Sequence, residues 1–216
     1  MNITKYEHAC LVVEEQGKKL IIDPGVFTTS LQDFSNVVAV VVTHMHPDHL
    51  NPETLQKIVA ANPDVQIFTT TEAAAQITNL PTTAVTGDDS TQVAPFTLEF
   101  FGAQHAEIHP AIPRIQNVGV MVNDTFYYGG DSYTTPQRPV QVLAAPTSAP
   151  WLRAAELIDY LRMVKPAQAF ATHNALLSDI GHNMMNDIVK NTCAETDGVF
   201  TFLQPGDTLQ VTANQQ

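Results

Sequence analysis

The chain has 216 residues, of which 44% are hydrophobic and 15% charged, a composition that excludes a disordered or fibrous protein. At the usual ~100–200 residues per domain, we expect one domain that spans residues 1–216. The two cysteines are too few for a disulfide scaffold or a cysteine-built zinc site. A formal net charge of -12 opposes binding to nucleic acid or to an anionic membrane surface.

The sequence also carries no sign of a leader or a membrane span. The N-terminal segment has no apolar region, and the longest aliphatic run is Val37–Val42, far shorter than the ~20 residues that a spanning helix needs. We therefore expect a cytoplasmic protein that acts on a small molecule and binds neither nucleic acid nor membrane. The sequence leaves open whether copies form a homo-oligomer.

Strands and helices alternate in the first half of the chain. Apolar runs at 9–15 and 19–23, separated by a glycine turn, predict a hairpin. The run 37–42 has no polar face, which predicts a strand buried on both sides of a sheet. A helix is predicted over 52–61, where a proline lies at the start and an Asn-Pro pair follows the end. We also expect strands at 65–70 and 96–102 and a short helix at 71–79.

The second half repeats this alternation. Runs at 117–122 and 126–128 predict a hairpin, and a terminal hairpin is expected over 199–211 with its turn at a Pro-Gly-Asp sequence. Periodicity predicts strands at 140–144 and 169–172 and helices at 153–165 and 178–191. Because some strands form hairpins while others are separated by helices, we expect mixed sheets in a layered α/β domain.

The strongest motif follows the buried strand directly. Residues 43–49 read Thr-His-Met-His-Pro-Asp-His and place three imidazoles and one carboxylate within six residues. Imidazole nitrogen and carboxylate oxygen are ligands that Zn²⁺, Fe and Mn²⁺ accept, and Pro47 stiffens the turn. The alternative is a solvated loop with a chance cluster, which this spacing behind a buried strand argues against. The motif predicts a metal site at the end of the strand.

The motif His44-x-His46-x-Asp48-His49 resembles the signature of the metallo-β-lactamase-fold hydrolases. Further segments match that family along most of the chain: Ile21-Ile-Asp23-Pro-Gly25, His105 after a predicted strand, Tyr128-Gly-Gly-Asp131-Ser132, and Ala171-Thr-His173. The segments Tyr6-Glu-His8-Ala-Cys10 and Ser148-Ala-Pro-Trp151-Leu look most like the subgroup of small hydrolases related to L-ascorbate-6-phosphate lactonases.

The resemblance implies a four-layer αβ/βα sandwich, in which helices flank two mixed β-sheets, with a dinuclear metal site at one edge. It implies that one metal ion is bound by His44, His46 and His105, that the other is bound by Asp48, His49 and His173, and that Asp131 bridges them. Each ion would keep one position for water. Histidine-rich ligation favours two Zn²⁺ ions per chain, with Mn²⁺ or Fe as alternatives.

Each of these residues also has an ordinary structural interpretation. His105 and His173 could be core or surface histidines, and Asp131 could be an Asx-turn residue. Asp23 is expected to support residues 43–49, called the metal loop below, without touching metal. His8 either shares that supporting role or is an ordinary residue at a strand end.

Hydrolysis is the reaction that the resemblance implies. Water bound to a divalent metal has a pKa of about 7, so a hydroxide that bridges the two ions could attack a small anionic ester, lactone or phosphodiester. Asp48 or Asp131 could act as the catalytic proton shuttle. The sequence holds no GxSxG, P-loop or GxGxxG motif that would support another chemistry. An RNA- or DNA-processing nuclease of the same fold and a non-catalytic metal-binding regulatory module stay open as alternatives.

Four residues are candidates for contact with substrate. Arg114 and Arg138 could each pair with a phosphate or carboxylate, or be solvated surface charges. Tyr133 lies in the same predicted loop as Arg138. Trp151, the single tryptophan, either stacks on the substrate or packs in the core.

Overall fold

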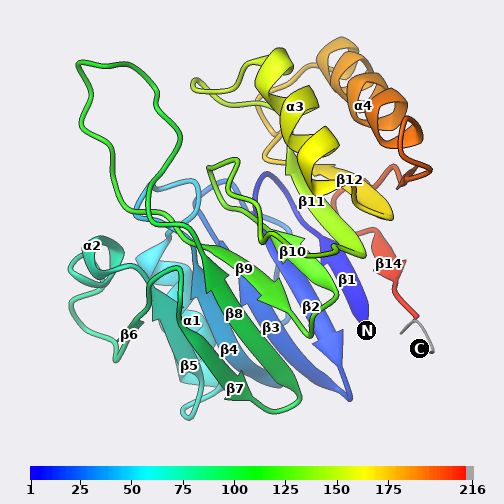
Figure 1. The fold of residues 1–216 in the computed structure, drawn as a ribbon. Helices are drawn as coiled ribbons and strands as arrows, with labels where there is room; N and C mark the ends of the chain where they lie inside the picture. The colour runs from blue at the N-terminus through cyan, green and yellow to red at the C-terminus, as the bar shows by residue number, and fades with distance from the viewer. Residues whose placement is uncertain (213–216) are drawn as a thin grey trace.

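The computed structural model describes residues 1–212 and contains two seven-stranded β-sheets that face each other (Figure 1). The strands of the first sheet are β1 (Asn2–Lys5), β2 (Leu11–Glu15), β3 (Lys18–Ile22), β4 (Val37–Val42), β5 (Gln66–Thr69), β6 (Thr83–Ala84) and β14 (Thr208–Gln210). Those of the second are β7 (Ser90–Val93), β8 (Phe96–Phe101), β9 (Gly119–Val122), β10 (Phe126–Tyr128), β11 (Val142–Pro146), β12 (Gln168–Thr172) and β13 (Val199–Phe200).

Both sheets are mixed, as the sequence predicts. The first has the order β14-β1-β2-β3-β4-β5-β6, and its pairs are antiparallel up to β3 and parallel from β3 to β6. The second has the order β13-β12-β11-β10-β9-β8-β7. Its strands β7 to β10 pair antiparallel, whereas β10 to β13 pair parallel. The parallel strands bring several carboxyl ends to the same edge.

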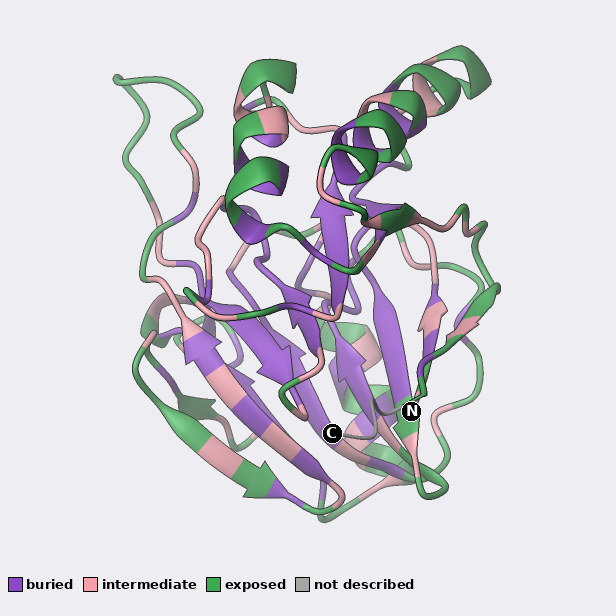
Figure 2. Ribbon diagram, turned by 45° about the vertical axis from the view of Figure 1, so that its right-hand side comes forward, coloured by how far each residue is buried: buried purple, intermediate pink, exposed green. Residues whose placement is uncertain are grey.

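Helices cover the outer face of each sheet. They are α1 (Pro52–Ala61), α2 (Thr71–Ala74), α3 (Ala154–Val164) and α4 (Asp179–Ala194). Apolar residues of α1 and α2 pack on the first sheet, and those of α3 and α4 pack on the second. Figure 2 shows the buried inner faces and exposed outer faces of α3 and α4. The expected fold class, a four-layer sandwich of two mixed sheets flanked by helices, is confirmed.

The largest core cluster fills the space between the sheets. Strand β4 shows how one apolar strand serves two layers: Ala39 and Val41 face the other sheet, whereas Val40 and Val42 face the helices. The strand is therefore buried on both sides, as its lack of a polar face predicts. The segment that follows it is held between rigid layers.

Several features of the fold differ from the sequence prediction. The predicted hairpin over 199–211 is wrong, because β13 pairs parallel with β12 in the second sheet and β14 pairs antiparallel with β1 in the first. The strand β1 was not predicted from the sequence, and it becomes an interior strand only because β14 pairs with it. The helix expected over 71–79 ends earlier, at Ala74. Within residues 1–212, no helix is long and apolar enough to cross a bilayer.

Candidate metal centre

The metal-ligand candidates come together at the carboxyl ends of the strands. His44, His46, Asp48 and His49 follow β4, Asp131 follows β10, and His173 follows β12. His105 lies in the long loop between β8 and β9, which rises from the same edge (Figure 1). The side chains form two clusters whose ligand atoms all lie within 4.8 Å of one another: His8, Asp48, His49 and His173 in one, and His44, His46, His105 and Asp131 in the other.

The carboxylate of Asp131 lies between the two clusters. Its Oδ1 is 3.3 Å from Nε2 of His49 and 3.2 Å from Nε2 of His173. Its Oδ2 is 3.3 Å from Nε2 of His105 and 4.0 Å from Nε2 of His44. Each oxygen therefore faces the histidines of a different cluster, which is the arrangement that a bridging carboxylate requires.

Asp23 and Thr43 fix the orientation of two of these histidines from below. The carboxylate of Asp23 accepts hydrogen bonds from the backbone N–H and the hydroxyl of Thr43, both at 2.7 Å, and from Nδ1 of His49 at 2.6 Å. Because the Thr43 hydroxyl donates to Asp23, its oxygen accepts from Nδ1 of His44 at 3.0 Å. Both imidazoles consequently carry their proton on Nδ1 and turn the lone pair of Nε2 into the centre.

Backbone carbonyl groups orient two further histidines in the same way. Nδ1 of His105 donates to the carbonyl oxygen of Ala106 at 2.6 Å, and Nδ1 of His173 donates to that of Ser148. Their Nε2 atoms thereby face the centre. His46 presents its Nδ1, which lies 3.1 Å from Nε2 of His44.

Charge and burial set the protonation of these groups. Burial lowers the pKa of His44 well below its usual value, and burial also lowers that of His46, so both are neutral at pH 7. Burial alone would raise the pKa of Asp131, but His49 and His173 outweigh it and hold the pKa well below its usual range. For His173, burial lowers the pKa, yet Asp131 and Asp48 raise it to about 9 in the metal-free site. A metal ion bound at Nε2 would displace that proton.

The residues present fit a metal ion. Nε2 of His105 and Oδ1 of Asp131 are buried and have no hydrogen-bond partner within residues 1–212, although buried polar atoms are almost always paired. Nε2 of His49 and Nε2 of His173 also face each other at 3.0 Å. A cation between these nitrogen and oxygen atoms satisfies all of them, and the donor set matches Zn²⁺, Mn²⁺ or Fe.

His8 lies closer to the centre than the sequence could show. Its imidazole is buried, and Nε2 is 3.0 Å from Oδ2 of Asp48. The backbone N–H of Ala175 donates to Nδ1 at 3.4 Å, so Nε2 carries the proton that Asp48 accepts. The ring centroids of His8 and His173 are 3.9 Å apart. Of the two interpretations open from the sequence, the geometry favours support of the metal loop.

Trp151 does not stack on an open face of the site. It is 4% exposed, and its Nε1–H donates to Oδ2 of Asp131 at 2.9 Å. Its ring contacts those of His105 and Tyr133 edge to face, with centroids 6.0 and 5.2 Å apart. Sequence reasoning missed this bond to Asp131, because only the fold brings the 146–151 loop beside the end of β10.

A pocket of about 580 Å³ borders the centre on the side of His105 and Trp151. Three of the candidate substrate residues line it: Arg114, Tyr133 and Trp151. Among residues 1–212, the side chain of Arg114 makes one hydrogen bond, a long one of 3.4 Å to Gln104. The hydroxyl of Tyr133 has no hydrogen-bond partner among residues 1–212. Arg153, which the sequence analysis did not single out, lines the same pocket.

Arg138, by contrast, is not at the metal centre. Its guanidinium is 2.6 Å from the carboxylate of Glu99 and 3.5 Å from that of Asp124, and it lies over the ring of Phe101. It lines a different pocket, near Lys165. The sequence placed Arg138 in the loop after Asp131 but could not show that the loop turns it back toward β8.

Gly25 allows the metal loop to pack against the end of β3. A Cβ atom on this residue would lie 1.9 Å from the carbonyl oxygen of Asp48 and 2.5 Å from the backbone nitrogen of His49. The backbone N–H of Val26 also donates to the carbonyl of Pro47 at 2.8 Å. The Asp23-Pro-Gly25 segment thus supports the loop from two directions.

Comparison with known proteins agrees with this geometry. A family model described as the beta-lactamase superfamily domain matches residues 2–173. The chain therefore belongs to the metallo-β-lactamase superfamily, and its fold and ligand clusters are those of a metal-dependent hydrolase. Over 183 residues it is 35% identical to protein Rv0786c of Mycobacterium tuberculosis (strain ATCC 25618 / H37Rv). The aligned region covers 82% of this chain and 86% of that relative.

Two solved structures show the same fold at low sequence identity. The metallo-β-lactamase fold protein YhfI from Bacillus subtilis has a TM-score of 0.74 and 16% identity, over 96% of this chain and 98% of YhfI. Igni18, a metallo hydrolase from the archaeon Ignicoccus hospitalis KIN4/I, has a TM-score of 0.73 and 17% identity, over 98% of this chain and 99% of Igni18.

Proposed function

We propose that the chain is a dinuclear metal-dependent hydrolase that binds two divalent ions. Zn²⁺ is the first candidate, and Mn²⁺ and Fe are the alternatives. One ion would be held by His44, His46 and His105, the other by Asp48, His49 and His173, with Asp131 between them. The observation that carries this proposal is the position of the Asp131 carboxylate, whose two oxygens face different clusters at 3.2–3.3 Å.

Bound divalent ions supply a water molecule with a pKa of about 7 and polarise the bond to be cleaved. The chain itself provides the groups that move the proton. Burial raises the pKa of Asp48, but hydrogen bonds from His173 and His8 outweigh it and hold the pKa below its usual range. The Asp48 carboxylate is therefore ionised at neutral pH, and its side chain is 24% exposed, so it can accept a proton at the mouth of the site.

The expected substrate is small and anionic: an ester, a lactone or a phosphodiester. The 580 Å³ pocket beside His105 suits a small molecule, and Arg114 and Arg153 line it and can pair with an anionic group. The net charge of -12 opposes long polyanions such as RNA. The resemblance of residues 6–10 and 148–152 to the lactonase-related subgroup makes a lactone the first substrate to test.

Metal analysis tests the dinuclear assignment. We expect about two ions per chain in the wild type, about one in His46→Ala and in His173→Ala, and loss of both at low metal concentration in Asp131→Ala. Lys18→Met, at the exposed first residue of β3, is the control and should retain both ions. One ion in the wild type, or unchanged content in Asp131→Ala, would refute the bridged pair.

Activity assays then separate the three functional hypotheses. The metal-loaded protein is assayed with a sugar lactone, an aryl ester, an aryl phosphodiester and single-stranded RNA. Turnover of one of the small substrates, lost in Asp131→Ala, supports the proposal. Cleavage of RNA that weakens steeply with salt would favour the nuclease instead. A fully loaded protein that turns over none of them would favour a non-catalytic metal-binding module.

A further inference from the structure

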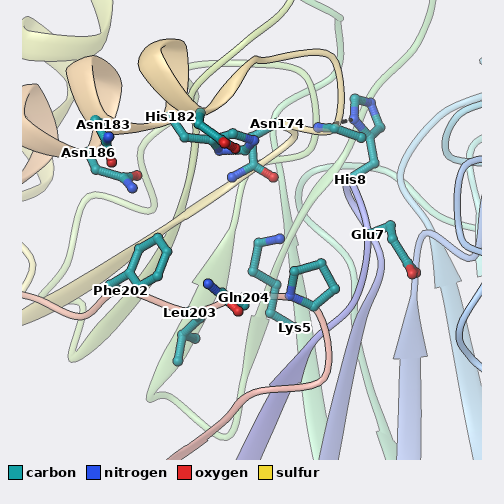
Figure 3. A pocket seen from close by; sticks show the side chains of 13 residues that line it. Lys5, Glu7, His8, Asn174, His182, Asn183, Asn186, Phe202, Leu203 and Gln204 are labelled. Atoms are coloured by element: carbon teal, nitrogen blue, oxygen red, sulfur yellow. Dashed lines mark hydrogen bonds between the residues drawn. The ribbon is translucent and has the colours of Figure 1, made fainter.

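A second pocket, of about 630 Å³, lies on the other side of the metal centre from the one beside Trp151, and the two share no residue. It is formed by the end of β1, the first turns of α4 and residues 202–205 (Figure 3). Its volume is typical of small-molecule sites. His8 forms one end of it, and no other candidate metal ligand lines it.

Three buried polar side chains line this pocket without full hydrogen bonding. Lys5 is 1% exposed, and within residues 1–212 its ammonium makes a single hydrogen bond, to the carbonyl oxygen of Tyr6 at 3.1 Å, although it can donate three. Asn174 and Asn186 are 6% and 8% exposed. Over the same residues, neither side-chain amide has a hydrogen-bond partner. Because these three largely buried side chains line the pocket with unused donors and acceptors, they can bind a partner from outside the chain.

The charges around the pocket select the kind of partner. Lys5 is its one lysine, and no arginine lines it, whereas Glu7 and Asp179 lie at its rim. The Glu7 carboxylate faces the backbone N–H groups of Thr29 and Ser30 at 3.3 Å. One buried cation matches one negative charge, while the rim carboxylates repel a second. A monoanion therefore fits better than a phosphate dianion.

The uncharged lining adds to this selection. The amides of Asn174 and Asn186 can each donate and accept hydrogen bonds, which suits amide or hydroxyl groups. Phe202 and Leu203 form an apolar wall that suits methyl or methylene groups. Figure 3 shows Lys5 and Asn174 around the same space, with Asn186 next to Phe202.

We propose that this pocket binds a small organic monocarboxylate that also carries amide or hydroxyl groups, with its carboxylate on the ammonium of Lys5. Burial lowers the pKa of Lys5 to about 8, so most of this side chain is protonated at pH 7. The site is separate from the proposed catalytic centre, and His8 forms the wall between them through its hydrogen bond to Asp48.

N-acetylglycine is the probe, because it combines one carboxylate with one amide. Its binding to the full-length, Zn²⁺-loaded protein at pH 7 is followed by ¹H–¹⁵N NMR, with N-acetylglycinamide as the neutral analogue and inorganic phosphate as the dianion. We expect shifts in the resonances of Ala175, Asn183 and Asn186. Affinity should fall roughly tenfold or more with N-acetylglycinamide and in the variant Lys5→Met, since a charge-assisted hydrogen bond is lost.

The variant Lys18→Met is the matched control, because it removes an exposed lysine that lies outside the pocket. It should bind N-acetylglycine as the wild type does. The variant Asn186→Leu should also weaken binding, which keeps the test decisive if Lys5→Met alters the packing. The proposal would be overturned by unchanged affinity in both pocket variants or by shifts confined to His49 and His173. It would also be overturned if phosphate shifted the resonances of the pocket residues and bound more tightly than N-acetylglycine.

Discussion

The indole N–H of Trp151 donates a hydrogen bond of 2.9 Å to Oδ2 of Asp131, the carboxylate that lies between the two ligand clusters. The residues come from different loops, after β11 and after β10. The backbone N–H of Asp131 is in turn held by the side-chain oxygen of Asn117 at 3.0 Å. The carboxylate that we propose as the bridge between the metal ions is thus positioned by a tryptophan and an asparagine, neither of which is a candidate ligand.

Replacement of Trp151 tests this positioning role. The variant Trp151→Phe keeps an aromatic ring but removes the donor, so the Asp131 carboxylate gains rotational freedom. We expect the affinity for the more weakly bound of the two metal ions to fall by roughly tenfold to a hundredfold. A loss of this size is typical when a residue that orients a ligand is removed. Competition with a chromogenic chelator measures this change directly.

Tyr160→Phe is the control for the tryptophan variant. Its hydroxyl belongs to the same aromatic cluster and is buried without a hydrogen-bond partner within residues 1–212. Metal affinity should therefore stay at the wild-type value in this control. A Trp151→Phe protein that bound both ions as tightly as Tyr160→Phe would show that the indole only fills space.

Asp23 supports the opposite side of the centre and gives a second prediction. Its carboxylate accepts three hydrogen bonds from Thr43 and His49, and an amide at this position must turn a donor toward one of them. We expect Asp23→Asn to lower metal affinity by roughly tenfold to a hundredfold and to destabilise the metal-free protein by about 1–3 kcal/mol. Asp64→Asn, at an exposed carboxylate, should change neither value in chelator competition or urea unfolding.

The positions of the candidate ligands could be predicted because they depend on local rules. His44, Asp131 and His173 each follow a strand that its apolar pattern identifies, and parallel strands end at a common edge. The hydrogen bond from Trp151 and the approach of His8 to Asp48 could not be predicted. They depend on how separate loops pack, and His8 itself has a left-handed backbone with φ of 58°.

The end of the chain shows the same limit for strands. Residues 199–211 contain two short strands around a glycine turn, which is the local pattern of a hairpin. Each strand instead pairs with a partner in a different sheet, at β12 and β1. Local sequence gives no information about which of two sheets offers a free edge, so this choice is made by the assembled fold.

Gly25 should be intolerant of any side chain. A Cβ atom there would come within 2.5 Å of three backbone atoms of Asp48 and His49, and backbone cannot rotate away as a flexible side chain can. We expect Gly25→Ala to destabilise the protein by about 3 kcal/mol and to displace the ligands that follow β4. Thermal unfolding and metal analysis report the two effects.

The glycine at position 181 provides the matched comparison. It lies inside α4, where an added methyl group would contact mainly the flexible side chain of Leu177, at 3.1 Å. Gly181→Ala should leave metal content unchanged and alter stability by less than about 1 kcal/mol, because alanine favours a helix. If Gly25→Ala were as stable and as fully loaded as Gly181→Ala, the metal loop would not depend on this close approach.

The buried Lys5 predicts how stability changes at alkaline pH. Burial lowers its pKa in the folded protein to about 8, from 10.5 for an exposed lysine. Between these values the unfolded chain binds more protons than the folded one, so the free energy of unfolding contributed by this group rises with pH. The full difference corresponds to about 3 kcal/mol. It is gained between pH 8 and pH 10.5 and is absent below pH 8.

The variant Lys5→Met lacks this gain and should be the more stable protein at pH 7, with the gap closing by pH 10.5. Urea unfolding of both proteins across this range measures the difference, with Lys18→Met, at an exposed lysine, as the control that follows the wild type. A constant gap between wild type and Lys5→Met from pH 7 to pH 10.5 would mean that the Lys5 ammonium is solvated rather than buried.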